Sequence, residues 1–277
     1  MMKRFGILFL IILLLAPSAF FAAAEKPDAR PNAANGATFT YADPRMGEQK
    51  DMSDKFMFAR VHFGPIIPGA YWGDGTRGIN AWSHDYPEAG LHLRKILGEV
   101  SKTPVHQDIN EYVFTFNDPN LCKYPFAYIC EVGGLDLSDA EIKGMREYLL
   151  RGGFLLVDDF RDIPGYSRYE YPVFHEYVKR AFPEEEYRIK PLDISHPIFN
   201  CFFSIKTLDV PPMSNYRGAK PQFLGLEDKH GRLMMMINYN YDVSDFWQWS
   251  NDPFQPIEDS NTAYKFGVNY IFYAMTH

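Results

Sequence analysis

The sequence predicts an α/β fold in three layers, a mainly parallel sheet flanked by helices. Short apolar runs that read as strands alternate along the chain with longer runs of helical periodicity, the pattern that predicts a parallel sheet covered by helices. The composition agrees, because 277 residues with 46% apolar and 23% charged side chains are typical of globular domains. A hairpin near the C-terminus is expected as an addition to this sheet.

Four separate strands and one hairpin are predicted. The strand-like runs cover residues 55–63, 112–116, 126–132 and 154–158. The runs 126–132 and 154–158 are dominated by large apolar side chains, which indicates buried, central strands. The hairpin consists of residues 223–227 and 232–238, with Gly231 in the turn between them.

Four helices are predicted, two of them from capping boxes. Asp85-Tyr-Pro-Glu88 opens the first, with Asp85 expected to accept from the third helical amide and Glu88 to reach back. Ser138-Asp-Ala-Glu141 opens the second, which Gly152-Gly153 ends. The remaining helices are expected over residues 171–182, before Pro183, and over 264–275, where apolar residues recur at helical spacing.

Residues 1–24 are predicted to be a signal peptide. Met1–Arg4 supply a cationic start, Phe5–Ala16 an unbroken apolar run, and Ala22–Ala24 the small residues that signal peptidase requires. We therefore expect cleavage after Ala24 and a periplasmic or extracellular protein. The apolar run is shorter than the ~20 residues that span a membrane, so no stable membrane span is expected after cleavage; a retained anchor is the alternative.

Residues 25–54 are predicted to form a flexible leader, and residues 55–277 a single domain. The leader has few large aliphatic residues and cannot bury enough surface to offset its ordering entropy. Loss of Lys3 and Arg4 with the signal peptide changes the net charge from −7 to −9. This acidic balance excludes a nucleic-acid partner, and the expected partner is an unknown small molecule or an envelope protein.

The three cysteines have no spacing typical of redox or haem chemistry. Cys130 lies in an apolar run and is expected to be a small buried hydrophobic residue. Cys122 and Cys201 flank loops. The expected compartment favours disulfides but the number of cysteines is odd, so the sequence does not decide whether these two form a disulfide.

Seven sequence motifs follow one another over residues 55–275. They are Arg60-Val-His62-Phe-Gly64, Ala81-Trp82-Ser-His-Asp85-Tyr-Pro87, Tyr124-Pro-Phe126, Leu137-Ser-Asp-Ala-Glu141, Arg151-Gly-Gly-Phe-Leu-Leu-Val-Asp158-Asp159, Ser195-His196-Pro197-Ile-Phe199 and Gly267-Val-Asn-Tyr-Ile-Phe-Tyr273. Each motif alone is weak, but in this order they are specific, and the set resembles the bacterial family catalogued as domain of unknown function 4159. The resemblance implies a relative of the class I glutamine amidotransferase-like, flavodoxin-like fold.

The resemblance also implies that thiol-dependent glutamine hydrolysis is absent. In catalytic amidotransferase-like domains a Cys nucleophile follows the strand that corresponds to residues 153–157, and a His and an acid complete the triad. In this chain Asp158 and Asp159 occupy those positions, and no Cys lies between them and Cys201. The resemblance does not imply any other reaction.

Asp158, Asp159 and Asp162 are candidates for a site at the strand ends. Ligands of open parallel sheets bind there, and paired carboxylates can hold Mg²⁺ or Ca²⁺ or accept hydrogen bonds from sugar hydroxyls. A divalent cation is the only cofactor that these residues suggest. In the structural alternative, one Asp caps a loop through nearby amides and the other pairs with Arg161 or Arg168.

Arg60 and His62 share one face of the first strand, because side chains alternate along it. Polar side chains on a buried strand need partners. Arg60 is expected either to pair with a structural acid, Asp85 or Asp158, or to act at a site. His62, at the strand's end, is the better ligand-binding candidate.

Trp82 and His196 are further candidates in loops. Trp82 is expected at the edge of the core or as a flat platform for a sugar ring or an apolar ligand. His196 precedes a Pro and is expected to be a helix cap or a site group.

The predicted function is ligand or partner binding without catalysis, at the ends of the parallel strands. Two alternatives stay open: a metal-assisted hydrolase that uses Asp158, Asp159 and a His as ligand or base, and an interaction module of a cell-envelope assembly. The predicted ligand-binding residues are Arg60, His62, Trp82, Asp85, Asp158, Asp159 and His196.

Overall fold

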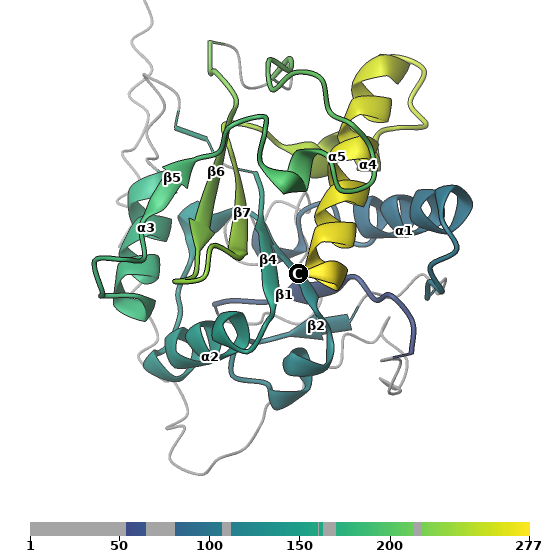
Figure 1. Cartoon of the computed structure of the whole chain (residues 1–277). Coiled ribbons are helices and arrows are strands. Elements are labelled where there is room, and N and C mark those ends of the chain that lie inside the picture. Colours follow the sequence, from purple (N-terminus) through teal and green to yellow (C-terminus); the bar gives the residue numbers. More distant parts are fainter. Residues whose placement is uncertain (1–53, 65–80, 107–111, 160, 163–169, 213–217) are drawn as a thin grey trace, which may run out of the picture. The chain divides into compact units, whose positions relative to one another are not determined.

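Seven strands form one sheet in the computed structural model, in the order β2-β1-β3-β4-β7-β6-β5 (Figure 1). The structure describes residues 54–64, 81–106, 112–159, 161–162, 170–212 and 218–277. The predicted signal peptide, almost all of the predicted leader and Arg168 lie outside the described residues. The strands are β1 (Ala59–Val61), β2 (Tyr112–Phe114), β3 (Phe126–Ile129), β4 (Phe154–Val157), β5 (Ile189–Pro191), β6 (Gln222–Glu227) and β7 (Leu233–Tyr239).

Five neighbouring strands of the sheet are parallel, which confirms the predicted mainly parallel α/β fold. β1 pairs with β2 and β3, β3 with β4, and β4 with β7, all in the same direction. The predicted hairpin is present as β6 and β7, and the short strand β5, which was not predicted, pairs antiparallel with β6. Because β7 lies beside β4, the hairpin is a continuous part of the main sheet.

Five α-helices are described: α1 (Glu88–Val100), α2 (Asp139–Leu150), α3 (Glu170–Ala181), α4 (Val243–Gln248) and α5 (Ile257–Thr276). Four short 3₁₀ helices accompany them: η1 (Ala81–Ser83), η2 (Pro119–Lys123), η3 (Val132–Gly134) and η4 (Pro197–Phe199). The capping box of α2 is confirmed, because Ser138 Oγ accepts from Glu141 N–H while Glu141 Oε2 accepts from Ser138 N–H. Helix α5 begins seven residues before its predicted start, and α4 was not predicted.

The capping box predicted at Asp85 is wrong. Helix α1 begins at Glu88 after Pro87, and no side chain caps its first turn. Asp85 has a left-handed backbone, with φ of +60°, and its carboxylate contacts Ser244 in α4. The Asp85 side chain therefore makes a tertiary contact with α4 in place of the helix cap that the local sequence pattern predicted.

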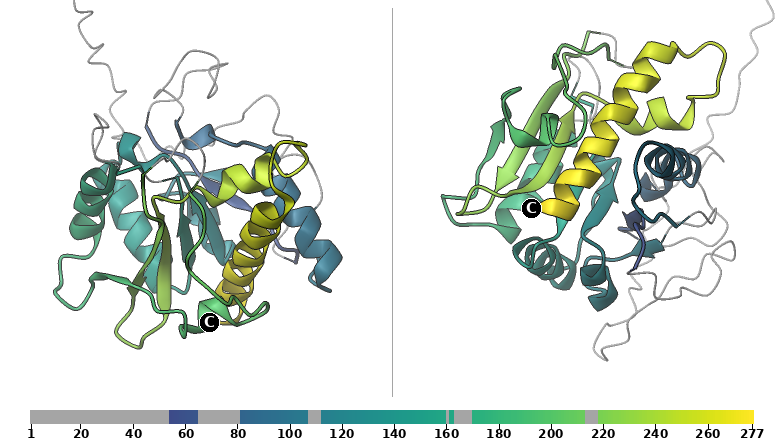
Figure 2. Two further views of the ribbon diagram at one scale, coloured as in Figure 1. Left: turned by 90° about the horizontal axis from the view of Figure 1, so that it is seen from above. Right: turned by 45° about the vertical axis from the view of Figure 1, so that its right-hand side comes forward.

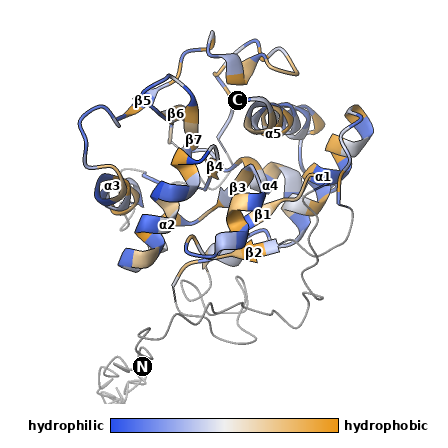
Figure 3. Cartoon of the chain, turned by 60° about the horizontal axis from the view of Figure 1, so that its bottom comes forward, coloured by the Kyte–Doolittle hydropathy of each residue, from blue (hydrophilic) through white to orange (hydrophobic). Residues whose placement is uncertain are grey.

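The helices cover both faces of the sheet, as Figures 2 and 3 show. Helices α2 and α3 pack on one face and α1, α4 and α5 on the other. Alternate strand residues supply the two cores: Leu155 and Val157 of β4 belong to the first, Phe154 and Leu156 to the second. The predicted three-layer arrangement is confirmed. Within the described part of the chain, none of the helices is both long and apolar enough to cross a membrane.

Gly144 allows α2 to approach the segment after β2. A Cβ at this position would lie 2.2 Å from the backbone oxygen of Phe116, closer than atoms can approach. The glycine in the middle of a helix is therefore required by packing, although glycine weakens isolated helices.

All three cysteines are free, so Cys122 and Cys201 do not form the disulfide that the sequence left undecided. Cys130 is fully buried after β3, as predicted. Cys122 is exposed, and the Cys201 thiol donates to the carbonyl oxygen of Asn269 at 3.1 Å.

Candidate functional site

The polar residues of the site gather at the C-terminal edge of the parallel strands, where the backbone turns sharply. Among the described residues, four that are not glycine have a positive φ: Asp85, Glu131, Asp159 and Asn240. Glu131 and Asp159 come two residues after β3 and β4, and Asn240 directly follows β7. A left-handed backbone costs about 1 kcal/mol or more per residue, and such strain concentrates at functional sites.

Asp159 and His84 are joined at the centre of this edge. His84 Nδ1 lies 2.8 Å from Asp159 Oδ2. An ionised carboxylate only accepts hydrogen bonds, so the proton is on Nδ1. Arg161 donates to Asp159 Oδ1 at 3.1 Å and to Glu131 Oε1 at 2.8 Å. The ends of β3 and β4 and the turn after η1 are thereby connected through the cationic side chains of His84 and Arg161.

These contacts separate the pKa values of the three ionisable partners. Burial alone would raise the pKa of Asp159, but the hydrogen bond and charge of His84, with the charge of Arg161, hold it well below its ordinary value. Burial alone would lower the pKa of His84, but the charges of Asp85, Asp159 and Glu131 raise it to about 10. Burial and the neighbouring Asp159 raise the pKa of Glu131 to about 9. At neutral pH Asp159 is thus an ionised acceptor beside a protonated His84.

Asp158 holds helix α4 against the sheet. Its carboxylate is fully buried and accepts from Asn238 Nδ2 at 2.8 Å, from Val243 N–H at 3.2 Å and from Ser244 N–H at 2.9 Å. Burial raises its pKa to about 7, although these three donors act in the opposite direction. This arrangement matches the structural alternative, in which one Asp binds backbone amides and the other, Asp159, pairs with Arg161.

Ser244 connects Asp85 with Asp242. Its hydroxyl lies 2.5 Å from Asp85 Oδ2 and 3.0 Å from Asp242 Oδ1, and accepts from the Tyr128 hydroxyl at 2.7 Å. Asp242 also caps α4 by accepting from Asp245 N–H at 2.9 Å. Burial and the neighbouring Asp245 raise the pKa of Asp242 well above its ordinary value. Asp85 therefore lies in this polar cluster, through contacts with Ser244 that the sequence did not indicate.

Arg60 positions the turn that carries His84. Its guanidinium donates to the carbonyl oxygens of Trp82 and His84, at 3.2 and 2.8 Å, and lies 4.7 Å from the centre of the Tyr128 ring. His62 is buried against Trp82, with 5.2 Å between the ring centres. Burial lowers the pKa of His62 to about 4, so this ring is neutral at pH 7. Trp82 is fully buried, so it lies within the core and not at the predicted core edge, and its ring does not offer an exposed platform for a ligand.

His196 lies at the other end of the sheet. Its Nδ1 accepts from Ile198 N–H at 3.2 Å and caps η4, the structural role that the sequence offered. Its ring lies against Tyr273, whose hydroxyl accepts from the N–H of Leu233 at the start of β7. The site lies where β7 ends, so His196 is not brought to it.

Sequence reasoning missed His84, Glu131, Asp242 and Ser244. His84 lies beside Asp85 in the motif of residues 81–87, but a single His in a loop does not by itself indicate a functional site. Glu131 and Asp242 follow β3 and β7, so the rule that selected Asp158 also applied to them. The signal for Asp242 was weakened because the six-residue helix α4 was not predicted.

Two groups of three side chains could hold a metal ion. His84, Asp85 and Asp242 form one, and His84, Glu131 and Asp159 form the other; in each group the ligand atoms lie within 4.8 Å of one another. Among the described residues Asp158 belongs to neither group. A cation at this edge would therefore use Asp159 or Asp242, and not the predicted pair Asp158 and Asp159.

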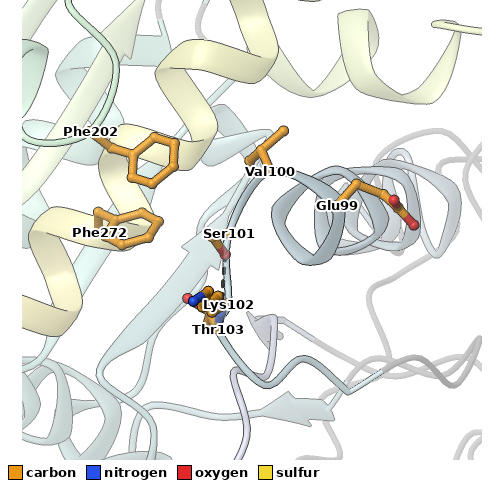
Figure 4. A pocket seen from close by; sticks show the side chains of 7 residues that line it. All are labelled: Glu99, Val100, Ser101, Lys102, Thr103, Phe202 and Phe272. Carbon is orange, nitrogen blue, oxygen red and sulfur yellow. Dashed lines mark hydrogen bonds between the residues drawn. The ribbon is translucent and has the colours of Figure 1, made fainter.

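Two large cavities of the described residues lie away from these side chains. One of about 620 Å³ lies at the C-terminus of α1, and Figure 4 shows Phe202 and Phe272 stacked on one side of it. Another of about 510 Å³ lies between α3 and β5 and is lined by Phe182 and Tyr187, among others. The charged residues at the strand ends contact one another, and neither of these cavities includes any of them.

A family model described as "Domain of unknown function (DUF4159)" matches residues 58–275, from β1 to the end of α5. The chain is a member of the DUF4159 family. This confirms the family that the motifs predicted. No curated protein matches the chain. All residues of the site fall inside the matched range, so the strand-end cluster belongs to the DUF4159 domain itself.

Proposed function

We propose that this DUF4159 protein is an exported domain that binds a small molecule or an envelope partner at the C-terminal edge of its parallel strands, without catalysing a reaction. The observation that carries the proposal is the state of Asp159. The resemblance to amidotransferase-like domains implies that Asp158 and Asp159 follow the strand after which a thiol enzyme has its nucleophile. The Asp159 carboxylate is fully buried and bonded to His84 and Arg161.

This environment makes Asp159 a poor nucleophile and a poor base. A general base must be free to take a proton near neutral pH, and a nucleophile must reach its substrate. The pKa of Asp159 is held well below its ordinary value, and both its oxygens accept hydrogen bonds. Asp158 is similarly committed to α4 and Asn238. These contacts support the proposal that this polar edge of the sheet is rigid, and that it binds a ligand without converting it to a product.

A thermal-shift screen of the purified protein tests the proposal. The panel contains saccharides, amino acids, organic acids and nucleotides, and the same compounds are incubated with the protein and examined for products. We expect a saturable rise in Tm for one class, reduced in His84→Gln, with no product formed. Hydrolysis of glutamine, of an ester or of a phosphodiester that disappears in Asp159→Asn would contradict it.

Export is tested separately from binding. The sequence features that support it are the cationic start, the apolar run and Ala22–Ala24. We expect the protein recovered outside the cytoplasm to begin at Glu25 by N-terminal mass analysis. An intact N-terminus in a membrane fraction would instead support a retained anchor.

Metal-assisted hydrolysis is the second candidate, because His84 belongs to two groups that could hold a metal. Such an ion would activate water for attack on an ester or phosphoester. Turnover of a chromogenic phosphodiester or ester that requires Zn²⁺ or Mn²⁺, and is absent after chelation, would favour this candidate over simple binding.

A further inference from the structure

Two buried carboxylate oxygens beside His84 have no hydrogen-bond partner among the described residues. They are Asp85 Oδ1 and Asp242 Oδ2. His84 Nε2 lies 3.5 Å from Asp85 Oδ1, which is too long for a good hydrogen bond. A buried oxygen without a partner is costly, so each of these atoms has the capacity to ligate a cation.

We propose that His84, Asp85 and Asp242 bind one divalent transition-metal ion such as Zn²⁺ or Mn²⁺. Their ligand atoms lie within 4.8 Å of one another. Two ligands at ~2.1 Å from a tetrahedral ion are ~3.4 Å apart, which is close to the 3.5 Å between His84 Nε2 and Asp85 Oδ1. One imidazole with two carboxylates suits Zn²⁺ or Mn²⁺ better than Ca²⁺, which prefers an all-oxygen shell.

The groups behind the three ligands are those that a metal site needs. A metal-binding His donates its second ring N–H to a carboxylate or a carbonyl, and His84 Nδ1 donates to Asp159. Ligating carboxylates are themselves held by hydrogen bonds. Asp85 Oδ2 is held by the Ser244 hydroxyl and Asp242 Oδ1 by Asp245 N–H. The second oxygen of each carboxylate is thereby left for the ion.

The local charge balance also favours a cation. Among the described residues, seven carboxyl side chains are buried around the strand ends, and the cationic side chains of His84 and Arg161 contact members of this group. A divalent ion offsets the charge of the ionised carboxylates, and its binding displaces the protons held on His84 Nε2 and on the carboxyl ligands. The seven are Asp85, Glu131, Asp158, Asp159, Glu170, Asp242 and Asp245.

The alternative group of His84, Glu131 and Asp159 is already bonded internally. His84 Nδ1 and Asp159 Oδ2 are 2.8 Å apart, a hydrogen-bond distance. Arg161 donates to both carboxylates of this group. An ion there would have to displace these contacts, whereas an ion at the Nε2 side of His84 uses two oxygens that accept no hydrogen bond from the described residues.

Metal binding by the full-length protein tests the proposal, independently of the ligand proposed above. Protein stripped with a chelator is titrated with Zn²⁺, Mn²⁺, Mg²⁺ and Ca²⁺ by calorimetry, and bound metal is counted by elemental analysis after gel filtration. We expect one Zn²⁺ or Mn²⁺ per chain, a higher Tm with the ion, and weaker binding of Mg²⁺ and Ca²⁺.

Three variants locate the ion. Asp85→Asn and Asp242→Asn are expected to weaken binding at least about tenfold, and Asn at 242 can still cap α4 through its carbonyl oxygen. Glu131→Gln is the matched control, since Glu131 is equally buried and lies 3.7 Å from His84 Nδ1, and it is expected to keep the ion. Circular dichroism checks that each variant is folded.

A measurement on the unmutated protein complements the variants. Pulsed electron paramagnetic resonance of the Mn²⁺-loaded protein is expected to show coupling to one imidazole nitrogen. The absence of stoichiometric Zn²⁺ or Mn²⁺ binding, or of nitrogen coupling, would overturn the proposal. Loss of the ion in Glu131→Gln with retention in Asp242→Asn would also overturn it, because the ion would then belong to the other group.

Discussion

Asp159 Oδ2 and His84 Nδ1 lie 2.8 Å apart although 75 positions separate the two residues in the sequence. This contact ties the end of β4 to the turn that follows η1. Both partners are largely shielded from water, since the His84 side chain is 13% exposed and that of Asp159 is fully buried. The pair is therefore expected to matter far more for stability than an ion pair on the surface.

A double-mutant cycle measures this coupling. Asp159→Asn or His84→Gln alone is expected to lower the free energy of unfolding by about 3 kcal/mol, because each removes the closest partner of a buried charge. The coupling energy from urea unfolding should exceed about 1 kcal/mol. The matched control is the exposed pair Arg180 and Asp139, whose N–O distance is also short, at 2.7 Å. A coupling in the site no larger than in that control would contradict the prediction.

Asp158 is expected to act on stability through α4. Asp158→Ala leaves Asn238 Nδ2 and two backbone N–H groups without their acceptor, and we expect a loss of about 3 kcal/mol in unfolding free energy. Asp158→Asn keeps one acceptor and should cost less. Glu185→Ala is the control, since its carboxylate is exposed, and should leave the unfolding curve unchanged. Equal curves for Asp158→Ala and the wild type would rule out this structural role.

His62 should make the protein less stable in acid. Burial lowers its pKa from 6.5 to about 4. Below pH 6.5 the unfolded chain therefore takes up a proton that the folded protein does not, and stability falls as the pH drops from 6.5 to 4. The contribution is about 3 kcal/mol over this window.

The variant His62→Phe isolates this effect from other groups that titrate in the same range. Unfolding free energies of the wild type and the variant are compared at several pH values between 4 and 7. As the pH falls, the unfolding free energy of the wild type should decrease more than that of the variant. Parallel curves would show that His62 does not titrate differently in the two states.

Gly144→Ala should destabilise the protein, although the same change stabilises an exposed helix by about 1 kcal/mol. The added Cβ would meet the backbone oxygen of Phe116 at 2.2 Å, and backbone atoms cannot move aside as a flexible side chain can. We expect a loss of at least about 1 kcal/mol from overpacking, measured by thermal and urea unfolding. A raised Tm would show that α2 can shift away from the segment after β2.

Local patterns predicted those elements that local contacts decide. The box from Ser138 to Glu141 succeeded because both of its hydrogen bonds form within one helical turn. The similar pattern at Asp85 failed because a residue in α4, distant in sequence, holds that carboxylate. The strands β3 and β4 were recognised from their apolar runs, whereas β5 is three residues long and largely exposed, and offers no such run.

The sequence predicted where the candidate site lies in the sheet, but it did not predict which residues contact one another there. The rule that polar residues gather where parallel strands end selected Asp158 and Asp159 correctly as neighbours of the edge. Their division of roles depends on α4, which presents the amides of Val243 and Ser244 to Asp158. His84 could not be selected, because its importance comes from three carboxylates contributed by different segments of the chain.

The order of the strands has a consequence for how the chain folds. The groups that meet at His84 come from segments after η1, β3, β4 and β7, and Asp242 follows β7, the strand that pairs with β4. A nascent or truncated chain that stops before β7 contains the residues of β1 to β4 but lacks Asp242 and helix α4. The buried acids of such a chain lack the hydrogen-bond partners that α4 supplies. We therefore expect this edge of the sheet to assemble late in folding, after β7 has joined the sheet.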